Sequence, residues 1–122
     1  MTDRIETIRL LFAAYLANDR QTVDDMLAED FRFTSPYDDA IDKATYFAHC
    51  WRGSDWIARH DIERVCIDGD AAFVTYECVA KDGKSFRNTE VFVFAGDRIN
   101  RIDVYFGATY RHGAFVRQGQ EA

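Results

Sequence analysis

The chain has 122 residues, of which 48% are hydrophobic and 15% aromatic, and its net charge is −6. A chain of this length buries roughly two thirds of its unfolded surface in one core, so we predict a single domain over residues 1–122. Lysine and arginine occur singly, which argues against nucleic-acid binding, and no apolar run approaches the roughly 20 residues of a membrane-spanning helix.

The N-terminal segment and the cysteines indicate the compartment. The segment MTDRIETIRLLFAAYLAND carries charges within its apolar pattern, unlike a signal peptide. The three cysteines, Cys50, Cys66 and Cys78, form no CxxC pair, and their number is odd. We therefore expect reduced thiols and a cytoplasmic protein.

The first elements of the chain are helical in pattern. Residues 3–18 repeat apolar side chains at helical spacing, which predicts an amphipathic helix. Asp19 is expected to cap a second, short helix that carries Leu27 on its apolar face. Residues 31–36 alternate and stop at the only proline, which predicts a short strand.

A polar stretch then leads into a third helix and a run of strands. YDDAID, residues 37–42, is expected to be a loop, and residues 42–51 a helix. Four strand-like runs follow, separated by Asp-Gly or Gly-Asp turns, at 58–67, 71–80, 85–95 and 98–107. About residues 112–122 we expect a loose tail. Helices followed by strands indicate an α+β fold, with the sheet bent over the helices as a cone.

The order of these elements resembles the NTF2-like superfamily, and within it the SnoaL-like and ketosteroid-isomerase-like proteins. The segment AAYLANDRQTVDDMLAEDFRFTSP is similar to the family's first two helices and first strand, and TEVFVFAGDRINRIDVYFG to its final hairpin. The resemblance implies a cone-shaped, cystatin-like fold with three N-terminal helices packed in a strongly bent antiparallel sheet. It also implies a homodimer through the outer sheet face. Because the superfamily hosts isomerases, hydrolases, cyclases and binding modules, the fold leaves the function open.

The hairpin loop at Asp82-Gly83 predicts which side chains share a face. A two-residue loop pairs Glu77 with Asn88, Thr75 with Glu90, and Phe73 with Phe92. We expect this aromatic face to line a pocket. The other face should meet a partner subunit, and it carries Val74, Tyr76, Cys78, Arg87, Thr89, Val91 and Val93.

The last hairpin allows two registers. A three-residue loop from Gly96 to Arg98 places Val104 beside Glu90, as in the family that the chain resembles. A two-residue loop places Asp103 there instead. We prefer Val104 and keep Asp103 as the alternative.

Glu90 is the main candidate for chemistry, because it points where the aromatic side chains point. An unpaired buried carboxylate is costly, so Glu90 should be hydrogen-bonded, neutralised or hydrated. One interpretation is a general acid or base, or a ligand-binding group, in a mostly apolar cavity. The alternative is a structural glutamate held by Thr75, Tyr15 or a water molecule. Glu77 on the same face could divide acid and base roles with Glu90, unless it is solvated at the rim.

The expected pocket combines these carboxylates with neutral side chains. We expect the wall to include Tyr15, Phe33, Trp51, Phe73, Thr75, Asn88, Phe92 and Val104. The three histidines, His49, His60 and His112, match no metal-ligand spacing, so we expect neither a metal nor another cofactor. These features favour an isomerase, hydrolase or cyclase that acts by proton transfer on a small hydrophobic molecule. The alternative is a non-catalytic binding module or a dimeric scaffold.

The resemblance also limits the mechanism. Ketosteroid isomerases carry a catalytic Asp before a proline where this chain has Ser35, and an oxyanion-hole tyrosine that aligns with Leu11. Epoxide hydrolases of the superfamily carry an Asp where Val104 stands. Only the second oxyanion-hole acid has a counterpart here, which is Glu90.

Overall fold

The computed structural model describes residues 3–51 and 53–117. This part of the chain contains three helices, namely α1 (Arg4–Leu16), α2 (Arg20–Met26) and α3 (Lys43–Cys50). It also contains seven strands, namely β1 (Leu27–Ser35), β2 (Asp38–Asp42), β3 (Ile57–Asp68), β4 (Ala71–Ala80), β5 (Lys84–Ala95), β6 (Arg98–Arg111) and β7 (Ala114–Val116). No helix in these residues is long and apolar enough to cross a membrane.

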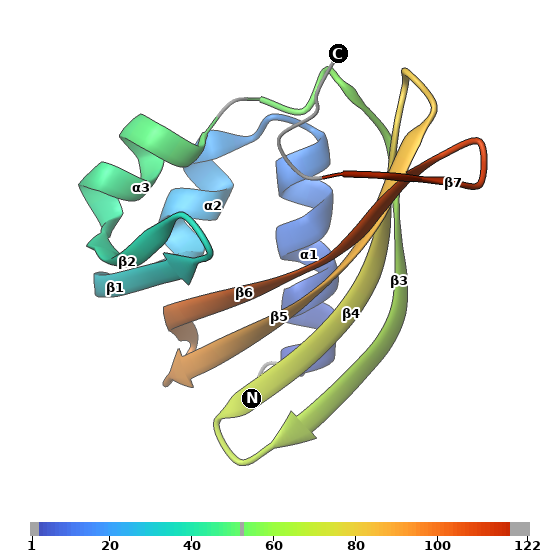
Figure 1. Cartoon of the computed structure of the whole chain (residues 1–122). Helices are drawn as coiled ribbons and strands as arrows, with labels where there is room; N and C mark the ends of the chain where they lie inside the picture. Colours follow the sequence, from blue (N-terminus) through green and yellow to red (C-terminus); the bar gives the residue numbers. More distant parts are fainter. Residues whose placement is uncertain (1–2, 52, 118–122) are drawn as a thin grey trace.

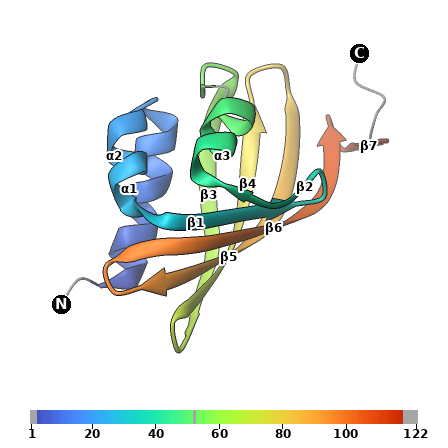
Figure 2. The ribbon, with the colours of Figure 1, turned by 90° about the vertical axis from the view of Figure 1, so that its left-hand side faces the viewer.

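The strands form one strongly curved sheet in the order β2-β1-β6-β5-β4-β3, and β7 pairs with the end of β6. β1 runs parallel to β6, and the other neighbours are antiparallel. Figure 1 shows α1 lying along the concave side of the sheet, while α2 and α3 lie beside β1 and β2. Figure 2 shows the same sheet from the side, where β1 and β6 cross in front of the upright β3 and β4. The architecture is an α+β cone.

Aspartates begin all three helices. The carboxylate of Asp3 accepts from the Ile5 N–H at 3.0 Å and that of Asp42 from the Thr45 N–H at 2.9 Å. Asp19 accepts from the Thr22 N–H at 3.2 Å, so the predicted cap of the second helix is confirmed. Each cap satisfies an amide that lacks a partner within its helix, which stabilises the helix by about 1 kcal/mol.

The core lies between α1 and the concave face of the sheet. Ile8 and Leu11 of α1 are fully buried, as are Val74 on β4 and Ile99 on β6. Burying one such side chain stabilises the fold by about 1.5–3 kcal/mol. The apolar face of α1 therefore fixes how deeply the helix sits in the curved sheet.

Two segments are more ordered than predicted. Residues 38–42, expected as a loop, form β2, because the turn after Ser35 folds the chain back and pairs Phe33 with Ile41. β1 begins at Leu27, which was expected on the second helix but lies opposite Ile99 in the sheet. Residues 114–116 of the expected loose tail form β7, while residues 118–122 lie outside the described part.

The β4–β5 hairpin differs from the prediction by one residue. Its loop is longer than two residues, because the Asp82 carboxylate accepts from the Lys84 N–H at 3.0 Å and Gly83 adopts a φ of +92°. Val79 therefore lies opposite Ser85 instead of Phe86. Since successive strand residues face opposite sides, this slip exchanges the two faces of β4 and leaves those of β5 unchanged.

The β5–β6 hairpin has the preferred register, but its loop is shorter than predicted and a bulge compensates for the difference. Val104 lies opposite Glu90, so Asp103 does not. Ala95 lies opposite Arg98, so the loop has two residues rather than three, and Gly96 takes the required positive φ of +64°. A bulge before Arg101 then restores the register.

Candidate functional site

A cavity of about 260 Å³ lies between the concave face of the sheet and the helices. Its walls come from α1, β1, α3, the segment after α3, and strands β3 to β6. About half of the lining residues are aromatic, namely Phe12, Tyr15, Phe33, Tyr46, Trp51, Trp56, Tyr76, Phe92 and Phe106. The cavity is therefore mostly apolar, as sites for small organic molecules are.

A second hollow lies beside the start of α1, where Asp3 and Arg4 contribute to its lining. Asp3 caps α1, and Arg4 donates to the Gly69 carbonyl at 3.0 Å and pairs with Asp70 at 3.1 Å. Because these charged groups already stabilise the fold, the first cavity is the better candidate site.

Glu90 lies on the cavity wall at the end of a chain of hydrogen bonds. The Tyr76 hydroxyl donates to Glu90 Oε2 at 2.5 Å, and Asn88 Nδ2 donates to the Tyr76 oxygen at 3.1 Å. The Gly107 N–H donates to Asn88 Oδ1 at 3.4 Å, which orients the amide. Every donor in the chain points toward Glu90, so the network supports negative charge on that carboxylate.

The surroundings of Glu90 nevertheless disfavour its charged form. Desolvation raises the pKa of Glu90 to about 7, and the hydrogen bond from Tyr76 opposes this shift without cancelling it. No lysine or arginine among the described residues lines the cavity. Both protonation states of Glu90 are therefore populated near neutral pH, as a group that transfers protons requires.

Two tyrosines beside Glu90 remain protonated. Burial raises the pKa of Tyr46 and of Tyr76, and the negative charge of Glu90 raises both further. The Tyr76 hydroxyl donates its hydrogen bond to Glu90. The Tyr46 hydroxyl, which lies on α3, makes no hydrogen bond within the described residues and is free to donate to a ligand.

The cavity wall includes six of the eight side chains expected to line it, namely Tyr15, Phe33, Trp51, Asn88, Phe92 and Val104. The other two, Phe73 and Thr75, lie on the outer face together with Glu77, so their expected place was wrong. Thr75 shares a hydrogen bond of 2.8 Å with Thr89 instead of contacting Glu90. The one-residue slip of the β4–β5 hairpin moves all three.

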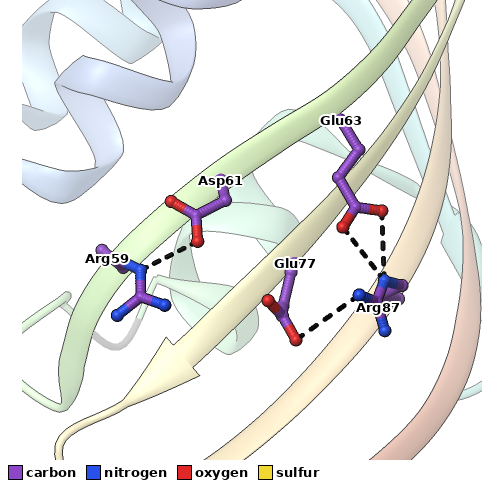
Figure 3. A network of polar contacts seen from close by, with 5 residues as sticks. All are labelled: Arg59, Asp61, Glu63, Glu77 and Arg87. Carbon is purple, nitrogen blue, oxygen red and sulfur yellow. Dashed lines mark hydrogen bonds and ion pairs between the residues drawn. The ribbon is translucent and has the colours of Figure 1, made fainter.

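Glu77 is thus not a second carboxylate of the pocket. Its Oε2 lies 3.8 Å from Arg87, which also donates to both carboxylate oxygens of Glu63 at 3.1 Å (Figure 3). Beside this group, Arg59 pairs with Asp61 at 2.8 Å. The outer face therefore carries a solvent-exposed network of charges.

The same slip brings Val74, Tyr76 and Cys78, expected on the outer face, to the concave side, where all three are buried. Tyr76, the partner of Glu90, is the most important residue that the sequence-based prediction missed. The simple alternation along β4 could have found it, because Ala72, Val74, Tyr76 and Cys78 are all compatible with burial. The two-residue loop predicted at Asp82-Gly83 placed these side chains on the outer face instead.

At three positions the enzymes that this chain resembles carry catalytic residues, and here the side chains at these positions have structural roles or line the cavity. Ser35 donates to Asp38 at 3.0 Å and accepts from the Tyr37 N–H at 3.1 Å, which stabilises the β1–β2 turn. Leu11 and Val104 contribute apolar surface to the cavity. Within residues 3–51 and 53–117, no group of three or more His, Cys, Asp or Glu side chains could hold a metal ion.

Comparisons with known proteins agree with this architecture. A family model for the SnoaL-like domain matches residues 8–102. An NTF2-like protein of unknown function from Cytophaga hutchinsonii superposes with a TM-score of 0.73 at 14% identity, over 87% of this chain and 91% of that one. A search of curated proteins found no match.

Two further structures have the same fold. A protein from Jannaschia, provisionally assigned as a SnoaL-like polyketide cyclase, gives a TM-score of 0.71 at 16% identity over 84% of this chain and 83% of its own. A provisionally assigned ketosteroid isomerase from Kribbella flavida gives 0.69 at 18% identity, over 94% and 84%. At these identities the likeness establishes the NTF2-like fold.

Proposed function

The chain belongs to the SnoaL-like domain family, and we propose that it is a cofactor-free enzyme that transfers protons on a small hydrophobic molecule. Glu90 is the proposed acid or base, and Tyr76 and Asn88 orient it. The observation that carries the proposal is a carboxyl group with a pKa of about 7 on the wall of an aromatic cavity. Two structural neighbours carry provisional assignments as a polyketide cyclase and a ketosteroid isomerase, which agrees with this reaction class.

The test uses nitrobenzisoxazole, a small neutral probe whose ring opens when a base removes its C–H proton and whose product is coloured. We expect the wild-type protein to accelerate this reaction. Glu90→Gln keeps the shape of the side chain but cannot transfer the proton, so the rate should fall by about 100-fold or more. Glu29→Gln, at an exposed position of β1, is the matched control and should keep the wild-type rate.

Two outcomes would count against this function. A Glu90→Gln variant as fast as the wild type would exclude Glu90 from the chemistry. A wild-type protein that binds the probe without opening its ring would favour a non-catalytic binding module, which is the alternative function for the same pocket.

We also propose that the protein is a homodimer through the part of the outer sheet face around Val91 and Val93 of β5. Val91 and Val93 lie on this face, next to Phe73 and Tyr105, whose exposed fractions are 41% and 61%. Exposed aromatic side chains beside valines are typical of an interface. Light scattering should find twice the mass of 14.1 kDa, and Val91→Lys should reduce it to one chain. A wild-type monomer at all concentrations would contradict the proposal.

A further inference from the structure

His60 lies on the cavity wall without a hydrogen-bond partner. It is on β3, opposite Cys78, and its ring meets those of Phe12 and Tyr76 edge-on, with centroids 5.6 Å apart in both cases. Its Nδ1 is unpaired and closed off from solvent, whereas its Nε2 is not buried in this way, makes no hydrogen bond to a described residue, and is the nitrogen that a ligand can reach. A buried polar group that only supports the fold is normally paired, so this histidine requires another explanation.

Tyr76 stands between His60 and Glu90. Its ring contacts the imidazole, and its hydroxyl donates to the Glu90 carboxylate. The two titratable groups come from β3 and β5, line one cavity and make no ion pair with each other. A ligand in the cavity can therefore lie against both groups.

We propose that His60 is a second proton-transfer residue of this pocket, which accepts a proton from one end of a neutral ligand while Glu90 donates a proton to the other end. This inference rests on the proposed function of Glu90 and adds its reaction partner. The ligand class is a neutral carbonyl compound with an acidic C–H bond. His60 takes that proton, the C–H electron pair becomes a carbon–carbon double bond, and the carbonyl oxygen takes the proton of Glu90. Glu90 then takes its proton back from the enol oxygen, and His60 delivers its proton to a different carbon or to the opposite face of the same carbon, which completes an isomerisation without any co-reactant.

The protonation states suit this division of roles. Burial lowers the pKa of His60, while the charge of neighbouring Asp61 opposes the shift, so the imidazole is a neutral acceptor near pH 7. Glu90, with a pKa of about 7, retains a proton to donate just below that pH.

No cation among the described residues faces this pair. The titratable groups around His60 are Asp61 next to it on β3 and Cys78 and Tyr76 on β4, and those around Glu90 are Tyr76 and Tyr46. Tyr15 and Cys50 also line the cavity. Burial raises the pKa of Tyr46, Tyr76 and Cys78, so these three stay neutral at pH 7, and the charge of Asp61 is negative. Among the described residues an anionic ligand finds no countercharge in the cavity, which favours a neutral one.

The nitrobenzisoxazole probe tests both ends of the proposal. His60 would take its C–H proton, the C–H pair would form the nitrile, and the pair of the broken N–O bond would go to the phenolate oxygen, to which protonated Glu90 donates a hydrogen bond. The rate should then be bell-shaped in pH, rising below pH 6.5 as His60 loses its proton and falling near pH 7 as Glu90 does.

His60→Gln should abolish the rising limb and slow the reaction by about 100-fold. His49→Gln, at an exposed histidine of α3, is the control and should leave the profile unchanged. A His60→Gln variant with the wild-type rate, and a single limb that rises near pH 7, would show that Glu90 alone is the base. That result would overturn the inference and leave the proposed function intact. A silent Glu90→Gln would overturn both.

A second measurement on the wild-type protein does not depend on a variant that folds. Nitrogen NMR of the histidine side chains should show the His60 signals shifting when nitrobenzisoxazole is added, together with the carboxyl signal of Glu90. The signals of His49 and His112 should stay in place. If Glu90 responds and His60 does not, the inference is wrong. If neither responds, the probe does not bind and the proposed function fails as well.

Discussion

The two faces of the β4–β5 hairpin place the same kind of group in opposite surroundings. On the concave face, the only hydrogen bond that the Glu90 carboxylate receives from the described residues comes from a neutral hydroxyl, and none of these residues places a cation in the cavity. On the convex face, Glu77 and Glu63 share the guanidinium of Arg87 in contact with solvent (Figure 3). The difference shows that burial and partner, rather than residue type, make a glutamate suitable for proton transfer.

The largest expected effect is a loss of stability with rising pH that depends on Glu90. The pKa of Glu90 is raised from 4.5 to about 7 in the fold, so the folded state holds this proton more tightly than the unfolded state. Its contribution is fully present below pH 4.5 and is lost as the pH rises through about 7. The loss amounts to about 3 kcal/mol, since one pKa unit corresponds to about 1.4 kcal/mol.

Denaturant unfolding at several pH values measures this effect. Glu90→Gln should flatten the dependence between acid and neutral pH, whereas Glu77→Gln should leave it as in the wild type. If the two variants behave alike, the concave and convex faces do not differ in the way that the structure indicates.

Removing the hydroxyl beside Glu90 sharpens the comparison on the concave face. Tyr76→Phe keeps the ring that packs on Phe12 and His60 but removes the hydrogen bond that lowers the pKa of Glu90. The pKa of Glu90 should rise further, by about one unit, because a hydrogen bond to a charged group is worth about 1.5–3 kcal/mol. Carbon-detected NMR of the Glu90 carboxyl measures it, and an unchanged or lower value would contradict the network.

His60 offers a smaller effect of opposite sign. Phe in its place preserves the edge-on ring contacts and removes the unpaired buried nitrogen, so His60→Phe should stabilise the fold by about 1 kcal/mol. The same variant should lose the rising limb of the pH–rate profile. Thermal unfolding measures the first change, and a clear loss of stability would mean that His60 supports the fold.

The sequence predicted the elements well because their signals are local. Asp19 caps its helix through a neighbouring residue, and the Gly-Asp turns separate the strands as expected. Strand β2 was not predicted, because it forms only by pairing with β1 across the turn that contains the only proline. Strand pairing across a turn depends on geometry that residue type alone does not specify.

The prediction of the candidate site depended on the length of the β4–β5 loop. Glu90 and Asn88 were placed correctly because β5 faces the cavity in either register, whereas every expectation for β4 was reversed. The carboxylate of Asp82, bonded to the Lys84 N–H, favours the longer loop, and that contact is a side-chain detail of the folded turn. Tyr76 and His60 thus became candidates only through the structure.

Glu77 provides the smallest effect and the strictest control for the comparison. Its carboxylate lies 3.8 Å from Arg87, which keeps two shorter contacts with Glu63 when Glu77 is changed. An exposed ion pair is worth at most about 1 kcal/mol, because water screens the charges. Glu77→Gln should therefore change the free energy of unfolding by less than about 0.5 kcal/mol. Since Glu77 faces away from the cavity, the nitrobenzisoxazole rate should also match the wild type. A rate loss comparable to that of Glu90→Gln would mean that Glu77 reaches the ligand after all, which the register of β4 and β5 excludes.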